Sequence, residues 1–166
     1  MYRFLLYMFC LVSMSMKAQS FDKNEMQAIY EEVKTPYKFG LVVAPQDNFH
    51  KFDCPTIYKE NGIWYMTYVV YNGKDGLDGR GYETWLATSS DLLHWKTLGR
   101  ILSYQSEGWD MNQRGGFPSL IDWNWGGSYR MQTYHGRHWM TYIGGKGTGY
   151  EAVREPLNIG MAWTKG

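Results

Sequence analysis

A hairpin pattern that occurs twice constrains the fold of this chain more than any other feature. Its first copy places the turn Asn61-Gly62 between two expected strands, residues 54–59 and the aromatic stretch 64–71. An Asn-Gly pair between two apolar stretches is a strong signal for a β-hairpin. The chain is therefore expected to contain antiparallel sheet.

The second copy follows further along the chain, in the same order and with nearly the same spacing. The distance in sequence from Gly62 to Gly136 nearly equals the distance from Ala87 to Ala162. Repeated units of about four strands predict an all-β fold of the β-propeller type. The matching segments are 53–58 with 116–121, 61–69 with 135–143, 81–83 with 149–151, and 85–89 with 159–164.

Shorter signals place the remaining elements. A helix is expected over residues 22–34, within an N-terminal helical segment 21–35, because Asp22 can cap it and apolar residues follow on one helical face. Pro36 then ends the helix, since the residue before a proline is disfavoured in the α region. Further strands are expected at 41–43, 83–89 and 96–102.

Residues 1–20 have the composition of a secretory signal peptide. A short positive start precedes an apolar stretch and a small, polar end that includes Ala18. Such a stretch is short for a membrane span, and no later segment is apolar enough for one. The mature protein is therefore expected to be secreted or periplasmic. Cys54 is then its one cysteine, which excludes an internal disulfide.

The composition is that of a globular protein and excludes several classes of function. Hydrophobic residues make up 44% and the net charge is +1, so no basic stripe is present for a nucleic-acid partner. No dinucleotide fingerprint, phosphate loop or zinc-ligand spacing occurs, and no cofactor or metal is expected. Aromatic residues, at 17%, suit either a β-sheet core or surfaces that stack on sugar rings.

Three features together resemble the five-bladed β-propeller glycoside hydrolases, above all family 43 and its relatives. They are the acid ahead of a proline in Asp53-Cys54-Pro55, the repeated hairpin, and the segment 87–95, which holds Ser-x-Asp-Leu-x-x-Trp. The resemblance implies that residues 36–166 form the first two blades. Two blades do not close a propeller, so the chain is expected to be the N-terminal part of a longer protein whose C-terminal blades are its partner.

The resemblance also implies hydrolysis of a glycosidic bond by carboxylates that face each other across a central funnel. Asp53 matches the position of the base, although an Asp before a turn also caps it. Asp110 is a candidate for the acid that tunes the general acid, for a substrate hydrogen-bonder, or for a solvated loop acid. Glu151 is the candidate general acid within this chain. Its recurrence as Glu83 indicates a structural role instead, and the family's general acid usually lies in a later blade.

The expected substrate is a polysaccharide or oligosaccharide. Trp109, Trp64 and Trp125 are candidates for stacking on sugar rings. Arg114 and Arg80 would hold an anionic sugar or orient a carboxylate, or are surface arginines. Inversion of configuration is expected from the resemblance to family 43. The alternatives are a carbohydrate-binding propeller without catalysis and a phosphorylase of the same architecture.

Overall fold

The computed structural model describes residues 22–34, 39–72, 80–149 and 157–165, so the expected signal peptide lies outside the described residues. The chain divides into one unit that ends at Lys38 and another that begins at Phe39. The described part of the first unit is a single helix, α1 (Lys23–Val33), as the sequence predicts. The Asp22 carboxylate caps it by accepting from the N–H groups of Asn24 (2.7 Å) and Glu25 (2.8 Å).

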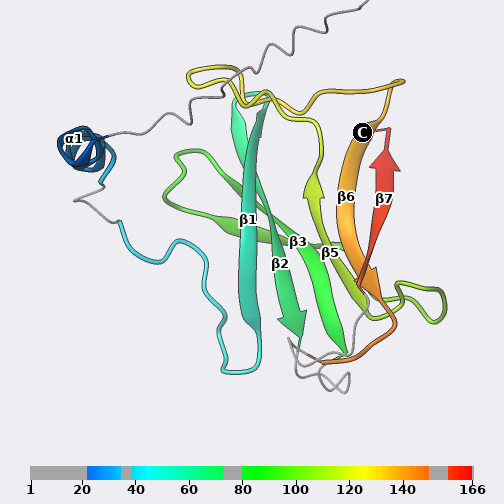
Figure 1. Ribbon diagram of the computed structural model, residues 1–166. Coiled ribbons are helices and arrows are strands. Elements are labelled where there is room, and N and C mark those ends of the chain that lie inside the picture. Colours follow the sequence, from blue (N-terminus) through cyan, green and yellow to red (C-terminus); the bar gives the residue numbers. More distant parts are fainter. Residues whose placement is uncertain (1–21, 35–38, 73–79, 150–156, 166) are drawn as a thin grey trace, which may run out of the picture. The chain divides into compact units, whose positions relative to one another are not determined.

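The second unit consists of two antiparallel sheets (Figure 1). The chain runs through each sheet in sequence order, so neighbouring strands are also consecutive strands. No helix in the described part of the chain is long and apolar enough to cross a membrane. The first sheet contains β1 (Lys51–Glu60), β2 (Ile63–Asn72), β3 (Gly81–Ser89) and β4 (Lys96–Leu102), and the second contains β5 (Gln113–Pro118), β6 (His138–Gly145) and β7 (Asn158–Thr164).

The turn before β2 and the turn before β6 have the same backbone conformation. Asn61 and Gly62 have φ values of 50° and 82°, and His135 and Gly136 have φ values of 51° and 65°. Two successive residues with positive φ define the type I′ turn, whose twist suits a hairpin. Each sheet thus contains the same tight turn, and the sequence match between 61–69 and 135–143 is a match of structure.

The strand register repeats as well. Met66 of β2 pairs with Ala87 of β3, and Met140 of β6 pairs with Ala162 of β7. The two pairs occupy the positions that the sequence repeat assigns to each other. A one-residue slip would send every side chain to the other face of a sheet, so an identical register preserves the division into faces.

One face of the first sheet carries the core, which centres on Met66, Tyr68, Val70 and Ala87. The expected strand at 41–43 is wrong, because this segment is irregular. Val43 packs against the core instead, and burial of its side chain there takes the place of strand pairing.

The other face of the first sheet packs on β5. The Thr84 hydroxyl of β3 donates to the Arg114 carbonyl (2.9 Å) and accepts from the Gly116 N–H (2.7 Å). A Cβ at Gly115 would lie 3.2 Å from both Val69 methyl carbons, so glycine permits the close approach of β5 to β2. Both the hydrogen bonds and the missing Cβ fix β5 on this face.

Two Asp-x-x-His turns hold the irregular segments around the first sheet. The Asp47 carboxylate accepts from the N–H groups of Phe49 (2.8 Å) and His50 (2.9 Å) and pairs with His50 Nδ1 (2.8 Å). The hydrogen bond from the His50 backbone is the largest of several effects that lower the pKa of Asp47 to about 2. Asp91 and His94 repeat this arrangement in the blade-ending motif.

Replacement of the Thr84 hydroxyl tests the contact between the sheets. Thr84→Val is expected to lower the free energy of unfolding by about 1–3 kcal/mol, because the buried Gly116 N–H loses its partner. Urea unfolding monitored by tryptophan fluorescence measures the change. The matched control is Thr88→Val in the same strand, whose hydroxyl bonds to the Trp64 carbonyl within its own sheet. Equal losses in the two variants would contradict a special role for the cross-sheet contact.

Candidate active site

One end of the second unit collects acidic side chains from several strands. The register pairs the start of β1 with the end of β2, the end of β2 with the start of β3, and the start of β5 with the end of β6. The Arg80 side chain joins these groups by donating to Asn112 Oδ1 (2.6 Å). We call this region, with Asp53, Glu83 and Asp110, the acidic end.

Asp110 is the most enclosed acid of the predicted site, with 4% of its surface exposed. Its Oδ2 accepts from Arg114 Nε (3.1 Å) and from the Tyr142 hydroxyl (2.8 Å). Burial, followed by the hydrogen bond to Asp110, raises the pKa of Tyr142. Asp110 is therefore not a solvated loop acid but a fixed carboxylate, held by one cation and one hydroxyl.

Trp109 lies beside this carboxylate and keeps 42% of its surface exposed. Its indole stacks on the Tyr142 ring, with 5.7 Å between ring centroids and 20° between planes. A Cβ at Gly144 would lie 2.7 Å from Trp109 Cζ3, so only glycine leaves room for the indole. The result is a supported aromatic surface next to a buried acid, an arrangement that suits the apolar face of a sugar ring.

Arg114 connects Asp110 to a second buried acid. Its Nη1 donates to the Ser103 carbonyl (2.5 Å), and the Ser103 hydroxyl donates to Glu83. Glu83 is fully buried and lies 3.4 Å from Arg100 Nε. Buried carboxylates need such partners, and Arg114 therefore holds the network together from inside, since its guanidinium bonds with the protein.

Arg80 fastens the loop between β4 and β5. Besides Asn112, it donates to the carbonyls of Gln105 and Met111, the latter at 3.3 Å, and it lies over the Tyr104 ring at 4.9 Å. These bonds join the start of β3 to the loop that carries Trp109 and Asp110. The structure thus places Arg80 behind the site, where it orders the loop.

Asp53 lies exposed at the same end, near the start of β1. One carboxylate oxygen accepts from the Cys54 N–H (2.7 Å). The strand bulges between Asp53 and Thr56, and Cys54 has a φ of 49°. Asp53 therefore caps a bulge, as the alternative interpretation of the sequence proposed, and its exposed carboxylate is still accessible to a ligand. Bulges often re-aim side chains next to active sites.

The other predicted residues do not join this group. Glu151 lies outside the described residues. Trp64 lies at the other end of the sheet, where its ring packs on Tyr129 with 5.7 Å between centroids. Trp125 belongs to the same loop as Tyr129 and is 98% exposed. Since β1 has ten residues, its two ends are about 33 Å apart, so neither tryptophan reaches the acidic end.

Sequence reasoning missed Tyr142 and Gln113. Tyr142 belongs to the Met-Thr-Tyr that marks the repeat, and its counterpart Tyr68 bonds to Thr97 (3.0 Å) rather than to an acid. Gln113 is fully buried, accepts from the Tyr82 N–H (3.1 Å) and donates to the Gly147 carbonyl (3.0 Å). A comparison of the acids near each tyrosine could have found the first. No sequence signal indicates the second.

The site offers carboxylates and an aromatic surface rather than a metal centre. Within residues 22–34, 39–72, 80–149 and 157–165, no group of three or more His, Cys, Asp or Glu side chains is arranged to hold a metal ion. The chemistry that the described residues can support is therefore proton transfer and hydrogen bonding by Asp53 and Asp110.

Comparison with known proteins gives structural relatives but no family. No family model matches the chain, and no curated protein matches it. Among solved structures, one named "Glycoside hydrolase" is 67% identical with a TM-score of 0.79, over 89% of this chain and 42% of that one. Another, a complex of BT0996 named with RGII, is 68% identical with a TM-score of 0.78, over 86% of this chain and 41% of that one.

A third structure is more distant. It is Zg3597, a family 117 glycoside hydrolase from the marine bacterium Zobellia galactanivorans, at 14% identity and a TM-score of 0.54, over 72% of this chain and 36% of that one. At this identity the likeness concerns the fold alone. The chain spans about two fifths of the two more similar structures. Its structural neighbours are thus glycoside hydrolases, and it matches part of their length.

Proposed function

We propose that this chain is part of a secreted glycoside hydrolase that cleaves a polysaccharide or oligosaccharide with carboxylate side chains. The 67% identity to a structure named "Glycoside hydrolase", over 89% of the chain, carries the proposal. The buried Asp110 beside the half-exposed Trp109 supports it, because a sugar needs both an aromatic surface and polar groups. Secretion is proposed from the signal-like residues 1–20 alone.

The proposed architecture is a five-bladed β-propeller of the family 43 type, in which the two sheets are consecutive blades. Their shared turn and register, and the packing of β5 on the first sheet, support this proposal. Blades of a propeller are repeated sheets of about four strands around a central channel. The acidic end would then open on that channel, with further blades in the remaining length of a protein like the neighbours.

In the proposed mechanism Asp53 is the base that activates water. Its exposed carboxylate lies at the acidic end, and a base must reach a water on the far side of the scissile bond. Asp110 is a positioning residue, because Arg114 and Tyr142 occupy its Oδ2. Glu151 is the candidate general acid within this chain, and a later segment is the other source. Inversion requires the base and the acid to be roughly 6.5–9.5 Å apart.

The neighbour whose name joins BT0996 and RGII gives the first substrate to test. At 68% identity over 86% of this chain, it shares most of the residues that surround the acidic end here. We therefore propose RGII, or an oligosaccharide derived from it, as the substrate class. Trp109 would stack on a sugar ring of that substrate.

The assignment of the base is tested by Asp53→Asn in the complete gene product. Hydrolysis of RGII oligosaccharides is expected to fall by about 10²–10⁴-fold, because an amide cannot accept the proton of water. Folding should be unchanged, since the amide oxygen can still accept from the Cys54 N–H. Glu107→Gln, an exposed acid in the loop before β5, is the control. Retained turnover in Asp53→Asn would remove the base from the mechanism.

The role of Asp110 is tested by its effect on the pH profile. Asp110→Asn removes a negative charge near the proposed general acid, and the pKa of that acid should fall because a like charge no longer opposes its ionisation. The basic limb of the kcat profile is therefore expected to move to lower pH, with kcat reduced about 10- to 100-fold. If the profile keeps its shape and only stability falls, Asp110 has a structural role alone.

A further inference from the structure

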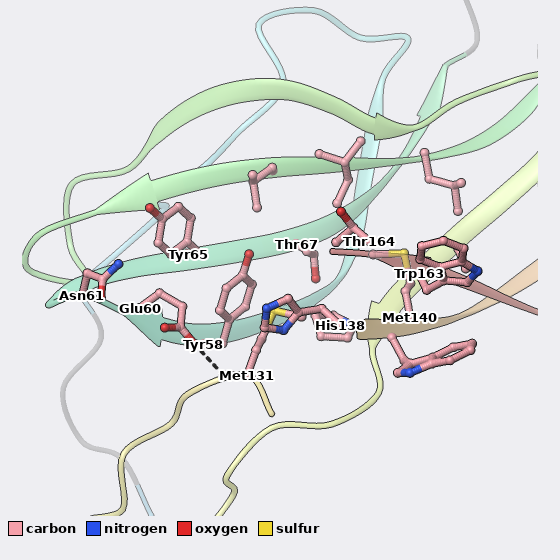
Figure 2. A pocket seen from close by; sticks show the side chains of 16 residues that line it. Tyr58, Glu60, Asn61, Tyr65, Thr67, Met131, His138, Met140, Trp163 and Thr164 are labelled. Carbon is pink, nitrogen blue, oxygen red and sulfur yellow. Dashed lines mark hydrogen bonds between the residues drawn. The ribbon is translucent and has the colours of Figure 1, made fainter. Parts of the chain in front are cut away.

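A second hollow lies between the two sheets at the end opposite the acidic end. We call it the cross-sheet cavity, and its volume is about 720 Å³. Figure 2 shows its lining, which includes Tyr58, Thr67 and His138. The turn residue Asn61 and the pair His138 and Thr164, which join the start of β6 to the end of β7, place it at this end. The volume lies in the range of about 300–1,000 Å³ that is typical of small-molecule sites.

Two polar atoms that line this cavity lack partners. Thr67 is 1% exposed, and its hydroxyl has no hydrogen-bond partner among the described residues. His138 Nδ1 is buried and likewise has no partner within the described part of the chain. Buried polar groups nearly always have a hydrogen-bond partner. Two orphan groups on the wall of one cavity therefore indicate a molecule that binds between them.

The rest of the lining is aromatic and carries little free charge. Tyr58 and Tyr65 stack with 5.3 Å between centroids and 13° between planes. The Glu60 carboxylate already accepts from Arg130 Nη2 (3.2 Å) and from the Met131 N–H (3.1 Å). Because the described lining contains neither Lys nor Arg, an anionic ligand would have no strong counter-charge. Aromatic faces with a hydroxyl and an imidazole suit a neutral, hydroxyl-rich ring.

The loop that supplies Met131 to the cavity wall is held firmly. The Asp122 carboxylate accepts from the Ser128 N–H (2.8 Å) and hydroxyl (2.7 Å), and the loop is anchored to β1 by the bond from the Lys59 N–H to the Tyr129 carbonyl (2.9 Å). Trp125 projects from this loop into solvent. A longer sugar chain would find there an additional ring to stack on.

We propose that the cross-sheet cavity is a secondary carbohydrate site, which binds one or two neutral sugar units through the Thr67 hydroxyl and His138 Nδ1. The choice of a sugar rests on the proposed function, whereas the cavity and its orphan groups do not. The site holds the substrate away from the acidic end and takes no part in the bond cleavage.

The proposal is tested by NMR titration of the complete gene product with three probes. Methyl β-D-galactopyranoside and methyl β-D-xylopyranoside represent neutral hexosides and pentosides, and D-glucuronic acid is the anionic comparison. Saturable shifts are expected at residues around Thr67 and His138, with the neutral glycosides bound more tightly. Thr67→Val should weaken that binding about fivefold or more, since it removes one hydrogen bond at nearly constant volume. His138→Phe, which removes the second orphan atom, should act in the same direction.

Thr141→Val is the matched control, because Thr141 lies on β6 outside the cavity lining. Equal binding in Thr67→Val and the unmodified protein, or no shift at the cavity with any probe, would overturn the proposal. The readout is independent of hydrolysis. Turnover without cavity binding would refute the secondary site and leave the proposed function intact, and cavity binding without turnover would refute the proposed function alone.

Discussion

The contact between Thr84 and β5 determines where the acids of this protein lie. One hydroxyl bonds to two backbone groups of the neighbouring sheet, at Arg114 and Gly116. Because Arg114 also binds Asp110, the backbone contact between the sheets fixes the side chain that holds the buried acid. The missing Cβ at Gly115 permits this approach. Packing of the two sheets and construction of the site are thus one structural event.

The strands then separate two regions of different chemistry. At the acidic end, Asp110 is buried under partners and Asp53 is open to solvent. At the other end, the cross-sheet cavity is mainly aromatic, and Thr67 and His138, whose polar atoms have no partner among the described residues, line it. The scaffold that joins them is a repeated hairpin. The repeat therefore supplies a rigid spacing, while the residues that differ between the copies supply the chemistry.

The sequence predicted the repeated parts well because they depend on local signals. Turn residues and alternating patterns identify hairpins, and the pairing of Met66 with Ala87 follows once the strands are known. The expected strand at 41–43 was wrong because packing of Val43 on the core prevailed over β propensity. Partnerships across the fold, such as Tyr142 with Asp110, were not predictable, since no local pattern brings residues on different strands together. For the same reason the sequence grouped Trp125 with Trp109, although they lie at opposite ends.

A crystal structure of the complete gene product, carrying Asp53→Asn and soaked with an RGII oligosaccharide, most directly tests whether the acidic end is the catalytic centre. The account predicts a sugar ring stacked on Trp109, with the scissile oxygen facing residue 53 across a water molecule. Asp110 should keep its bonds to Arg114 and Tyr142 in that complex. A sugar bound only away from Trp109, with residue 53 out of reach of every glycosidic bond, would contradict the account.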